Sequence, residues 1–313
     1  MADVKKIATR ESYGKALAEL GAEHDDVVVL DADLAGATKT ATFQKAFPDR
    51  HFDCGIAEAD MMCVAAGLST VGYVPFASSF AMFAAGRAFE QVRNSIGYPH
   101  LNVKIGATHG GISVGEDGAS HQCCEDFALM RSIPGMTVIC PADDVEARAA
   151  VKAAYAHQGP VYLRFGRLTV PVFHEEGLDF QIGKGEVLRD GTDVAIIANG
   201  LLVYEAIQAA ETLAAEGVSA MVINMATVKP LDEELVLSAA KKCGKVITCE
   251  EHSVIGGLGE AVCSLLSEKL PTPVRRIGVN DEFGHSGPAV PLLKAFGLSA
   301  EHIAQTAREI CGR

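Results

Sequence analysis

Short apolar runs rich in β-branched residues alternate with longer segments of helical periodicity along nearly the whole chain. The expected strands are Val27–Asp31, Tyr73–Ala77, Leu101–Ala107, Thr137–Cys140, Val161–Phe165, Asp193–Ala198, Val218–Asn224, Lys245–Cys249 and Val274–Val279. The expected helices between them are Arg10–Leu20, Ala57–Thr70, Phe80–Ile96, Asp143–Ala156, Tyr204–Ala215, Leu231–Lys241 and Leu258–Glu268. Near-continuous apolar strands separated by helices are typical of parallel sheets covered on both faces. The sequence therefore predicts an α/β protein built on parallel sheets.

A change in composition divides the chain into two parts. Between Leu168 and Asp190 the sequence has no long helical period, and we interpret this stretch as a connection that keeps some extended structure. A chain of 313 residues is long enough for two α/β domains, each with its own core. We therefore expect a first domain at residues 1–167, a linker at 168–189 and a second domain at 190–313.

The charge and cysteine content argue against several functional classes. The chain has 27 basic and 40 acidic residues, a net charge of −13, without a cluster of basic residues for nucleic acid or a membrane surface. Its nine cysteines include no Cys-x-x-Cys pair, which is typical of reduced thiols in a reducing compartment. The N-terminal residues form no apolar signal segment, and no apolar run approaches the ~18–20 residues of a membrane helix. We expect a soluble, cytoplasmic protein.

The stretch from Thr108 to His121 is the most glycine-rich polar segment and follows an expected strand. It contains His109, Glu116, Asp117 and His121 among four glycines. Glycine allows a backbone to approach a ligand closely, and loops after parallel strands often form active-site rims. A mobile, solvated loop is the alternative, but the two histidines that flank two acidic residues favour an active-site loop.

A second candidate site begins at the expected helix that starts near Ala57. Asp60 and Glu58 lie in its first turn, where negative charge complements the helix dipole, and this explanation suffices for Asp60. Glu58 lies among apolar neighbours (Ile56, Met61 and Met62), where burial raises the pKa of a carboxyl and favours sharing a proton with a ligand nitrogen. Phe80 and Phe83 follow at helical i, i+3 spacing; such a pair belongs either to the core or to a ring-binding pocket.

Several motifs occur together in the order and spacing of one enzyme family. They are Gly55-Ile56-Ala57-Glu58, Ser78-Ser79-Phe80-Ala81-Met82-Phe83, Gly115-Glu116-Asp117-Gly118-Ala119-Ser120-His121-Gln122, Pro134-Gly135-Met136, Pro141-Ala142-Asp143, Gly159-Pro160-Val161-Tyr162-Leu163-Arg164, Lys229-Pro230-Leu231-Asp232 and Phe283-Gly284-His285-Ser286-Gly287-Pro288. The ordered set resembles the C-terminal half of a transketolase. The resemblance spans nearly the whole chain and implies a pyrimidine-binding fold followed by the family's C-terminal-domain fold.

The resemblance implies a thiamine diphosphate enzyme that transfers a two-carbon ketol unit from a ketose phosphate to an aldose phosphate. Glu58 matches the glutamate that hydrogen-bonds the aminopyrimidine ring and favours the tautomer that accepts the C2 proton. Phe80 matches the aromatic that stacks on that ring, and Phe83 lines the same pocket. Asp33 matches a residue beside the cofactor near the subunit boundary. In such an enzyme the cofactor supplies the electron sink, and the protein favours the reactive tautomer of the ring, orients it and provides the electrostatic environment.

The resemblance also assigns substrate contacts. His121 matches the histidine that assists proton transfer at the donor oxygens, and Asp117 matches the aspartate that binds the hydroxyl beside the reacting carbon. Arg10, His109 and Arg167 match contacts to the phosphate end, a role suited to forked guanidinium groups. For Arg10 alone, a surface ion pair is an alternative.

The chain departs from the family pattern in two places. Ala37 replaces a phosphate-binding serine, for which Thr38 or Thr40 is a candidate substitute. No Gly-Asp-Gly motif is present to bind the diphosphate and its Mg²⁺ or Ca²⁺, and we expect no metal ligand in this chain. We infer a divided enzyme in which a separate N-terminal subunit holds diphosphate and metal. The chain alone is then inactive, and the assembly contains two copies of each subunit.

Other functions stay open at this stage. The β subunit of a 2-oxo-acid dehydrogenase and deoxyxylulose-phosphate synthase share the cofactor family. The Gly-Glu-Asp-Gly-x-x-His pattern at residues 115–121 argues against the first, and Arg10 and His109 favour transketolase over the second. A non-catalytic partner or regulatory subunit is a further alternative, and the retention of four residues argues against it: Glu58, Phe80, Asp117 and His121.

Overall fold

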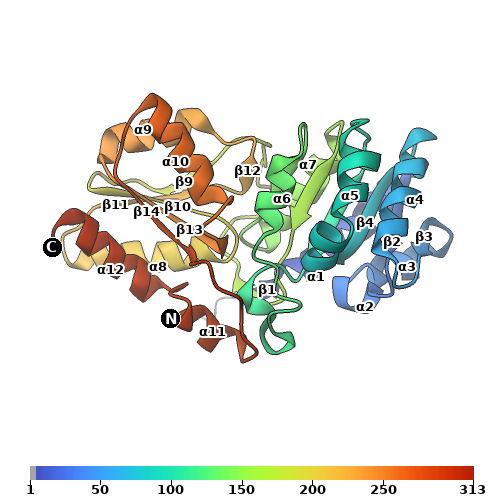
Figure 1. Cartoon of the computed structure of the whole chain (residues 1–313), viewed down its shortest axis with the longest axis horizontal. Helices are drawn as coiled ribbons and strands as arrows, with labels where there is room; N and C mark the ends of the chain where they lie inside the picture. The colour runs from blue at the N-terminus through green and yellow to red at the C-terminus, as the bar shows by residue number, and fades with distance from the viewer. Residues whose placement is uncertain (1–4) are drawn as a thin grey trace.

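The computed structural model describes residues 5–313 and contains two α/β units side by side (Figure 1). The strands of the first sheet are β2 (Val27–Asp31), β3 (His51–Asp53), β4 (Val74–Phe80), β5 (Lys104–Thr108), β6 (Thr137–Ile139), β7 (Val161–Arg164) and β12 (Thr227–Lys229). Their order is β12-β6-β7-β5-β4-β2-β3. All pairs are parallel except β12 with β6.

The helices of the first unit are α1 (Thr9–Glu23), α2 (Ala35–Thr38), α3 (Ala41–Ala46), α4 (Glu58–Thr70), α5 (Phe89–Gln91), α6 (Asp126–Ser132) and α7 (Asp144–Ala156). Short 3₁₀ turns lie at Pro48–Arg50 and Ile112–Asp117. The start of α7 shows a capped N-terminus, because the Asp143 carboxylate accepts a hydrogen bond from Glu146 N at 3.0 Å.

The helix expected over residues 80–96 is present as a helical segment, but its expected start and its expected continuity are wrong. Strand β4 continues to Phe80, which is paired with Thr108 of β5. Two π-helical turns, Met82–Arg87 and Val92–Gly97, then flank the short α5. π-Turns inside helical segments are uncommon and are frequent at functional sites. Pairing in the sheet therefore overrides the helical periodicity at the start of this segment.

The second unit has a five-stranded sheet in the order β14-β13-β10-β11-β9. Its strands are β9 (Glu186–Arg189), β10 (Val194–Ala198), β11 (Ala220–Asn224), β13 (Val246–Ser253) and β14 (Val274–Val279). Its helices are α8 (Leu202–Ala215), α9 (Glu233–Cys243), α10 (Leu258–Lys269), α11 (Ala289–Ala295) and α12 (Ala300–Cys311). Only β9 runs antiparallel, so each sheet has one antiparallel edge strand that the sequence did not indicate.

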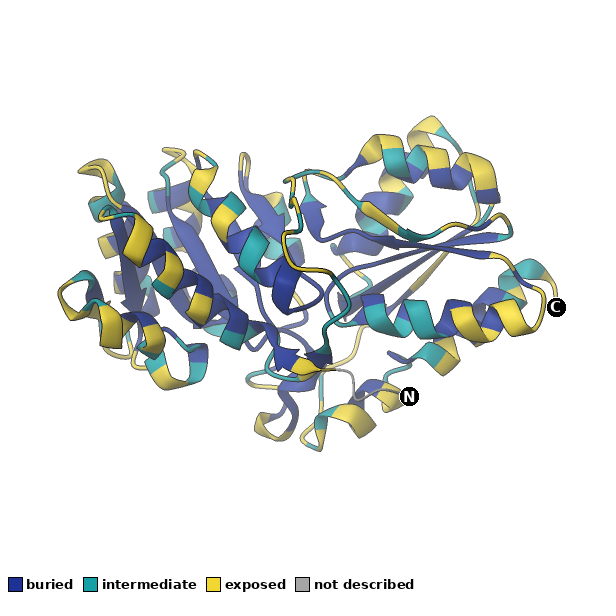
Figure 2. Ribbon diagram, turned by 180° about the vertical axis from the view of Figure 1, so that it is seen from behind, coloured by how far each residue is buried: buried dark blue, intermediate teal, exposed yellow. Residues whose placement is uncertain are grey.

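Two further short strands, β1 (Lys6–Ala8) and β8 (Thr169–Pro171), form a separate antiparallel pair. The central strands of both main sheets are buried, and the helices expose their outer faces (Figure 2). This layering explains the near-continuous apolar strands, because helices cover both faces of each sheet. Within residues 5–313, no helix combines the length and apolarity needed to cross a membrane.

The two units are joined through buried polar groups as well as through β12. Arg164 Nη2 donates to the carbonyl oxygens of Cys123 at 3.1 Å and Glu251 at 2.8 Å. Its Nε lies 3.1 Å from Asp126 Oδ2, and both side chains are at most 4 % exposed. The Asp126 carboxylate offsets the buried charge, and the two carbonyl oxygens accept from Nη2, so burial of this guanidinium is largely compensated. The second unit therefore meets the first through a specific polar contact.

Candidate active site

The carboxyl ends of β2, β4 and β5 lie side by side at one edge of the first sheet. Asp31 on β2 is paired with Ser78 on β4, and Phe80 is paired with Thr108 on β5. Strands β3 and β4 flank β2 on opposite sides, so the chain changes direction at this point of the sheet. Ligand sites in open α/β sheets usually lie at the carboxyl edge beside such a reversal.

Glu58 is the first residue of α4 and is only 2 % exposed. Its Oε2 accepts a hydrogen bond from Arg87 Nη1 at 2.8 Å, and the Arg87 side chain is 52 % exposed. The expected apolar surroundings are only partly present, because Met61 and Met62 are fully buried whereas Ile56 is 77 % exposed. The charge of Glu58 is thus matched by a guanidinium that reaches it from the solvent side.

Four rings gather beside this ion pair. Phe80 is buried and stacks on the His109 imidazole, with ring centroids 3.8 Å apart. Phe83 lies nearly parallel to Phe80 at 5.9 Å, and the His121 ring meets the edge of Phe83 at 5.3 Å. The Arg87 guanidinium lies over Phe83 at 4.5 Å, as in a cation–π contact. The two phenylalanines are neighbours as expected, although the end of a strand and a π-turn position them rather than one helix face.

Arg10 and His109 form a polar pair next to these rings. Arg10 Nη1 lies 3.0 Å from His109 Nε2, and His109 Nδ1 lies 2.8 Å from Thr108 Oγ1. Burial of the imidazole, followed by the charges of Arg10 and Arg167, lowers the pKa of His109 to about 3. His109 is therefore neutral at physiological pH.

The loop after β7 brings a second arginine to the same place. Gly166 N donates to Thr9 Oγ1 at 2.8 Å, and Arg10 N donates to Gly166 O at 3.4 Å, so this loop is held against the start of α1. Burial and the nearby Arg167 charge lower the pKa of Arg10. Arg167 also lies 3.3 Å from the exposed carboxylate of Glu116. Two guanidinium groups thus meet at the rim of the site, which suits a dianionic ligand.

The expectation that Thr38 or Thr40 replaces the phosphate-binding serine is wrong. The hydroxyls of Thr38 and Thr40 are fully buried and both donate to Asp31 Oδ2. Ala37 contributes only its backbone carbonyl, which accepts a hydrogen bond from Arg10 Nη1 at 3.0 Å. The threonines therefore stabilise the turn after β2 and are directed away from any ligand.

Asp33 lies on the exposed part of that turn. It has a positive φ of 59°, which is uncommon for a residue other than glycine. Its backbone N donates to Asp53 Oδ1 at 3.0 Å, and the same oxygen accepts from Gly55 N at 2.8 Å. Asp53 thereby links the turn that carries Asp33 to the turn that leads to Glu58.

The glycine-rich segment is ordered as a 3₁₀ turn at Ile112–Asp117 and a loop that returns to the first unit at Gln122. Asp117 is exposed on this loop, and His121 is half-buried beside the ring cluster. His121 Nδ1 lies 2.9 Å from Ser120 Oγ. The structure therefore brings His121, His109, Phe80 and Phe83 together, with Asp117 on the rim of the same loop.

Several residues of this region were not singled out as site residues from the sequence. Arg87 pairs with Glu58, and Lys39 lies close enough to His109 to contribute to its lowered pKa. Gln122 and Glu251 hold the glycine-rich loop from behind. Gln122 ends a recognised motif, but no sequence signal connects Arg87 with Glu58 or Glu251 with the loop.

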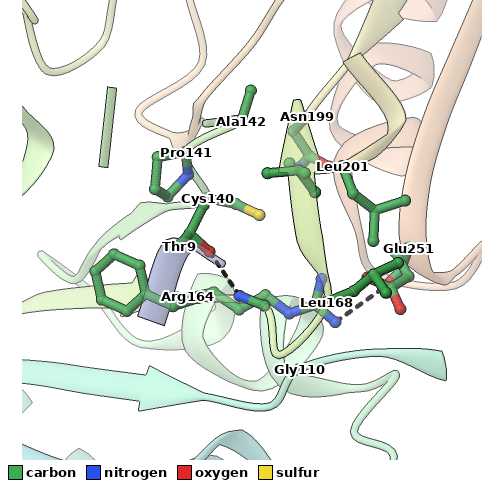
Figure 3. Close-up of a pocket in the computed structure, with 14 residues that line it drawn as sticks. Thr9, Gly110, Cys140, Pro141, Ala142, Arg164, Leu168, Asn199, Leu201 and Glu251 are labelled. Atoms are coloured by element: carbon green, nitrogen blue, oxygen red, sulfur yellow. Dashed lines mark hydrogen bonds between the residues drawn. The ribbon is translucent and has the colours of Figure 1, made fainter. Parts of the chain in front are cut away.

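A small cavity between the two units adjoins this site, because Thr9, Gly110 and Gly166 are among its lining residues. Figure 3 shows that it is lined by Arg164, Asn199, Cys140 and Glu251 among others. Its volume of about 20 Å³ is far below that of a substrate pocket. The cavity therefore belongs to the packing between the units.

Comparisons with known proteins match both units to one family. Residues 5–172 match the family model of the transketolase pyrimidine-binding domain, and residues 183–303 match the transketolase C-terminal domain. The chain is 51 % identical to a putative transketolase C-terminal section of Methanocaldococcus jannaschii, covering 96 % of this chain and 95 % of that protein. It is 38 % identical to human transketolase, covering 97 % of this chain but 49 % of that protein.

The solved structures show the same similarity. A split-gene transketolase described as an inactive β4 tetramer superposes with a TM-score of 0.91 at 55 % identity, covering 97 % of this chain and 98 % of that chain. Transketolase from Leishmania mexicana superposes with a TM-score of 0.84 at 26 % identity, covering 100 % of this chain and 47 % of that chain. The chain thus spans about half the length of the human and Leishmania mexicana transketolases.

Proposed function

This chain belongs to the transketolase family, and we propose that it is one subunit of a divided transketolase. In the proposed reaction, a two-carbon ketol unit passes from a ketose phosphate to an aldose phosphate. Two observations support the proposal together. The chain has the extent of a relative named as a C-terminal section, and its acidic, aromatic and cationic side chains converge at one sheet edge.

Transketolases depend on thiamine diphosphate, and the residues present fit its aminopyrimidine ring. Glu58 supplies a buried carboxylate oxygen, and Phe83 supplies a half-buried aromatic face beside the buried Phe80. A carboxylate acceptor next to apolar rings is the environment that a flat, protonated nitrogen heterocycle needs. When bound, thiamine diphosphate supplies the electron sink for cleavage of the ketose carbon–carbon bond.

We assign to Glu58 the task of holding a proton at the pyrimidine ring nitrogen. Its Oε2 already accepts a hydrogen bond from Arg87, so Oε1 is the oxygen left to accept from the ring. The half-exposed Arg87 places a positive charge beside the carboxyl, and it can move toward solvent when a ligand enters. Asp33, held by Asp53 near the turn that precedes Glu58, is assigned to the edge of the same pocket.

The substrate side of the proposal uses the opposite end of the ring cluster. Arg10 and Arg167 bind the phosphate end, and neutral His109 orients Arg10 through its Nε2. Lys39 adds positive charge near this place, where Ala37 offers no hydroxyl. His121 and Asp117 bind the donor oxygens near the reacting carbon, with His121 as the group that moves a proton there.

The diphosphate and its Mg²⁺ or Ca²⁺ are assigned to a separate N-terminal subunit. No Gly-Asp-Gly motif occurs in this sequence. A relative from Clostridium sp., 45 % identical over 97 % of this chain, is named as a subunit of a 6-deoxy-6-sulfo-D-fructose transketolase. We propose that two copies of this chain and two partner subunits complete the active sites. The sugar stays unspecified, because another relative, from Phocaeicola vulgatus and 40 % identical over 97 % of this chain, is named as a subunit of an apulose-4-phosphate transketolase.

The test is reconstitution of the two subunits. The chain is mixed with an N-terminal partner, thiamine diphosphate, Mg²⁺, a ketose phosphate donor and an aldose phosphate acceptor, and release of the shortened aldehyde from the donor is followed. We expect turnover only in the mixture, and much weaker cofactor binding by the chain alone in calorimetry. Decarboxylation of a 2-oxo acid without ketol transfer would instead identify a dehydrogenase β subunit. Tight cofactor binding by the isolated chain would overturn the divided site.

A further inference from the structure

The loop that carries Asp117 and His121 is held in place by the second unit. It contacts residues that are more than a hundred positions away in the sequence: the Ser113 backbone N–H reaches β13, and the Gln122 side chain reaches the segment before α11. We propose that Glu251 and Gln122 are positioning residues, which lock this loop to the second unit and so hold the donor-binding groups in place. This inference rests on the proposed function for what the loop binds, but not for how the loop is held.

Glu251 supplies the first lock. It lies on β13, is 4 % exposed, and its Oε1 accepts a hydrogen bond from Ser113 N at 2.5 Å. Gly111 lies directly against this carboxylate: a Cβ there would come within 2.3 Å of the carboxyl carbon, and its φ of +83° also favours glycine. The loop backbone is thus shaped to accept this one buried carboxylate. Arg164 lies close enough to offset its charge.

Gln122 supplies the second lock. Its carboxamide is buried, and Nε2 lies within hydrogen-bond distance of three carbonyl oxygens: Ile112 at 3.2 Å, Gly115 at 3.1 Å and His285 at 2.9 Å. The first two belong to the 3₁₀ turn, and the third belongs to the second unit. Gly284 allows this approach, because a Cβ there would lie 1.7 Å from Gln122 Oε1. A single amide group therefore joins both ends of the loop to the second unit.

The positions of Glu251 and Gln122 predict which property of the enzyme they affect, donor binding and turnover or cofactor affinity. Gln122 directly follows His121 in the chain, and Ser113 lies in the 3₁₀ turn that ends at Asp117. The groups assigned to the cofactor ring, Glu58, Phe80 and Phe83, lie on α4, at the end of β4 and on a π-turn, and neither Glu251 nor Gln122 hydrogen-bonds to these elements. Loosening the loop should therefore impair donor binding and turnover while leaving cofactor affinity unchanged.

The test compares Glu251→Ala with Glu250→Ala. Glu250 is the matched control, because its buried carboxylate also accepts two backbone N–H bonds, from Leu258 and Gly259, but at the start of α10. In hydrogen–deuterium exchange on the isolated chain, Glu251→Ala should accelerate exchange of the 111–121 peptide about tenfold or more. Glu250→Ala should leave that peptide unchanged. Glu251→Gln retains an acceptor for Ser113 N and should restore wild-type exchange.

Gln122→Glu is a second, independent variant. It preserves shape but replaces the amide N–H groups by a carboxylate that faces three carbonyl oxygens, so the loop should be released in the same way. In the reconstituted complex, both loop variants should lower kcat/KM for the donor by about 10- to 100-fold, with the thiamine diphosphate concentration for half-activation unchanged.

Each result bears on one proposal only. Wild-type loop exchange and wild-type donor kinetics in both variants would overturn the positioning role. Equal loss of donor and cofactor binding would also overturn it, because it would show general damage to the fold. If Glu251→Ala does not fold, the Gln122→Glu variant, in which Glu251 is unchanged, provides the test of the positioning role. If the wild-type complex transfers no ketol unit, the proposed function fails, while the exchange measurement still tests the locks.

Discussion

His109 Nε2 lies 3.0 Å from Arg10 Nη1, and this contact determines the state of the imidazole. A guanidinium can only donate, so Nε2 is the acceptor and Nδ1 carries the proton, which it donates to Thr108 Oγ1 at 2.8 Å. The lowered pKa of His109, about 3, agrees with this assignment. In the structure His109 orients a cation rather than contributing a charge of its own.

Arg10 is expected to bind the substrate phosphate. Arg10→Met should raise the KM for a phosphorylated ketose donor about 10- to 100-fold, because a charge-assisted forked contact is lost. The KM for an unphosphorylated ketose should change little, and steady-state kinetics of the reconstituted complex with both donors measure the difference. Arg10→Lys retains the charge without the fork and should give an intermediate value. Equal effects on both donors would contradict the phosphate role.

His109 should also make the free energy of unfolding depend on pH in the acid range. An unfolded histidine takes up a proton near pH 6.5, whereas buried His109 does so only near pH 3. Below pH 6.5 the unfolded state therefore binds more protons, and stability falls as the pH decreases toward 3. His109→Asn should remove on the order of 1–2 kcal/mol of this loss at pH 5. Urea unfolding at pH 5 and 7 compares the two proteins; an identical pH dependence would show that His109 titrates normally.

His174 should have the opposite effect at alkaline pH. Its Nδ1 lies 3.1 Å from Asp143 Oδ1 and its Nε2 lies 3.1 Å from Glu186 Oε2, so it bridges the first unit to β9. Burial alone lowers its pKa, but the contact with Asp143 and the charges of Glu146 and Asp143 outweigh burial and raise the pKa to about 9.

This bridge is fully present below the unfolded pKa of about 6.5 and is lost as the pH rises through 9. His174→Gln should therefore reduce the decrease in stability between pH 6.5 and 9 by on the order of 1–3 kcal/mol. Thermal unfolding across this range is the measurement. A variant that loses stability as steeply as the wild type would show that the bridge does not depend on charge.

Glu58 is expected to be essential for turnover but not for folding. Glu58→Gln keeps the shape of the side chain and an oxygen for Arg87, so the unfolding temperature should change by no more than a few degrees. The loss of a proton-holding group should lower kcat about 10²- to 10⁴-fold. Thermal unfolding and reconstituted turnover are measured on the same preparation. A fully active, folded variant would rule out the proton-holding role.

Much of the fold could be predicted because its signals are local. All the strands expected from the sequence are present, since parallel strands buried on both faces leave continuous apolar runs. The short strands β1, β3, β8, β9 and β12 were not predicted, because three or four residues carry too little pattern. The start of the helical segment was misjudged because pairing of Phe80 with Thr108 of β5 outweighs local helical periodicity at that residue.

The candidate site divides in the same way. By itself the sequence determined which residue types stand after which strands, and parallel pairing then places Phe80 beside the loop of His109. Only the tertiary structure decided that Arg87 pairs with Glu58, that Thr38 and Thr40 face Asp31, and that Glu251 holds Ser113. These contacts join residues by direction and distance rather than by spacing, and the last spans 138 positions. The first two contacts form when the first unit folds, and the last forms only when the two units pack together, so no local pattern records them.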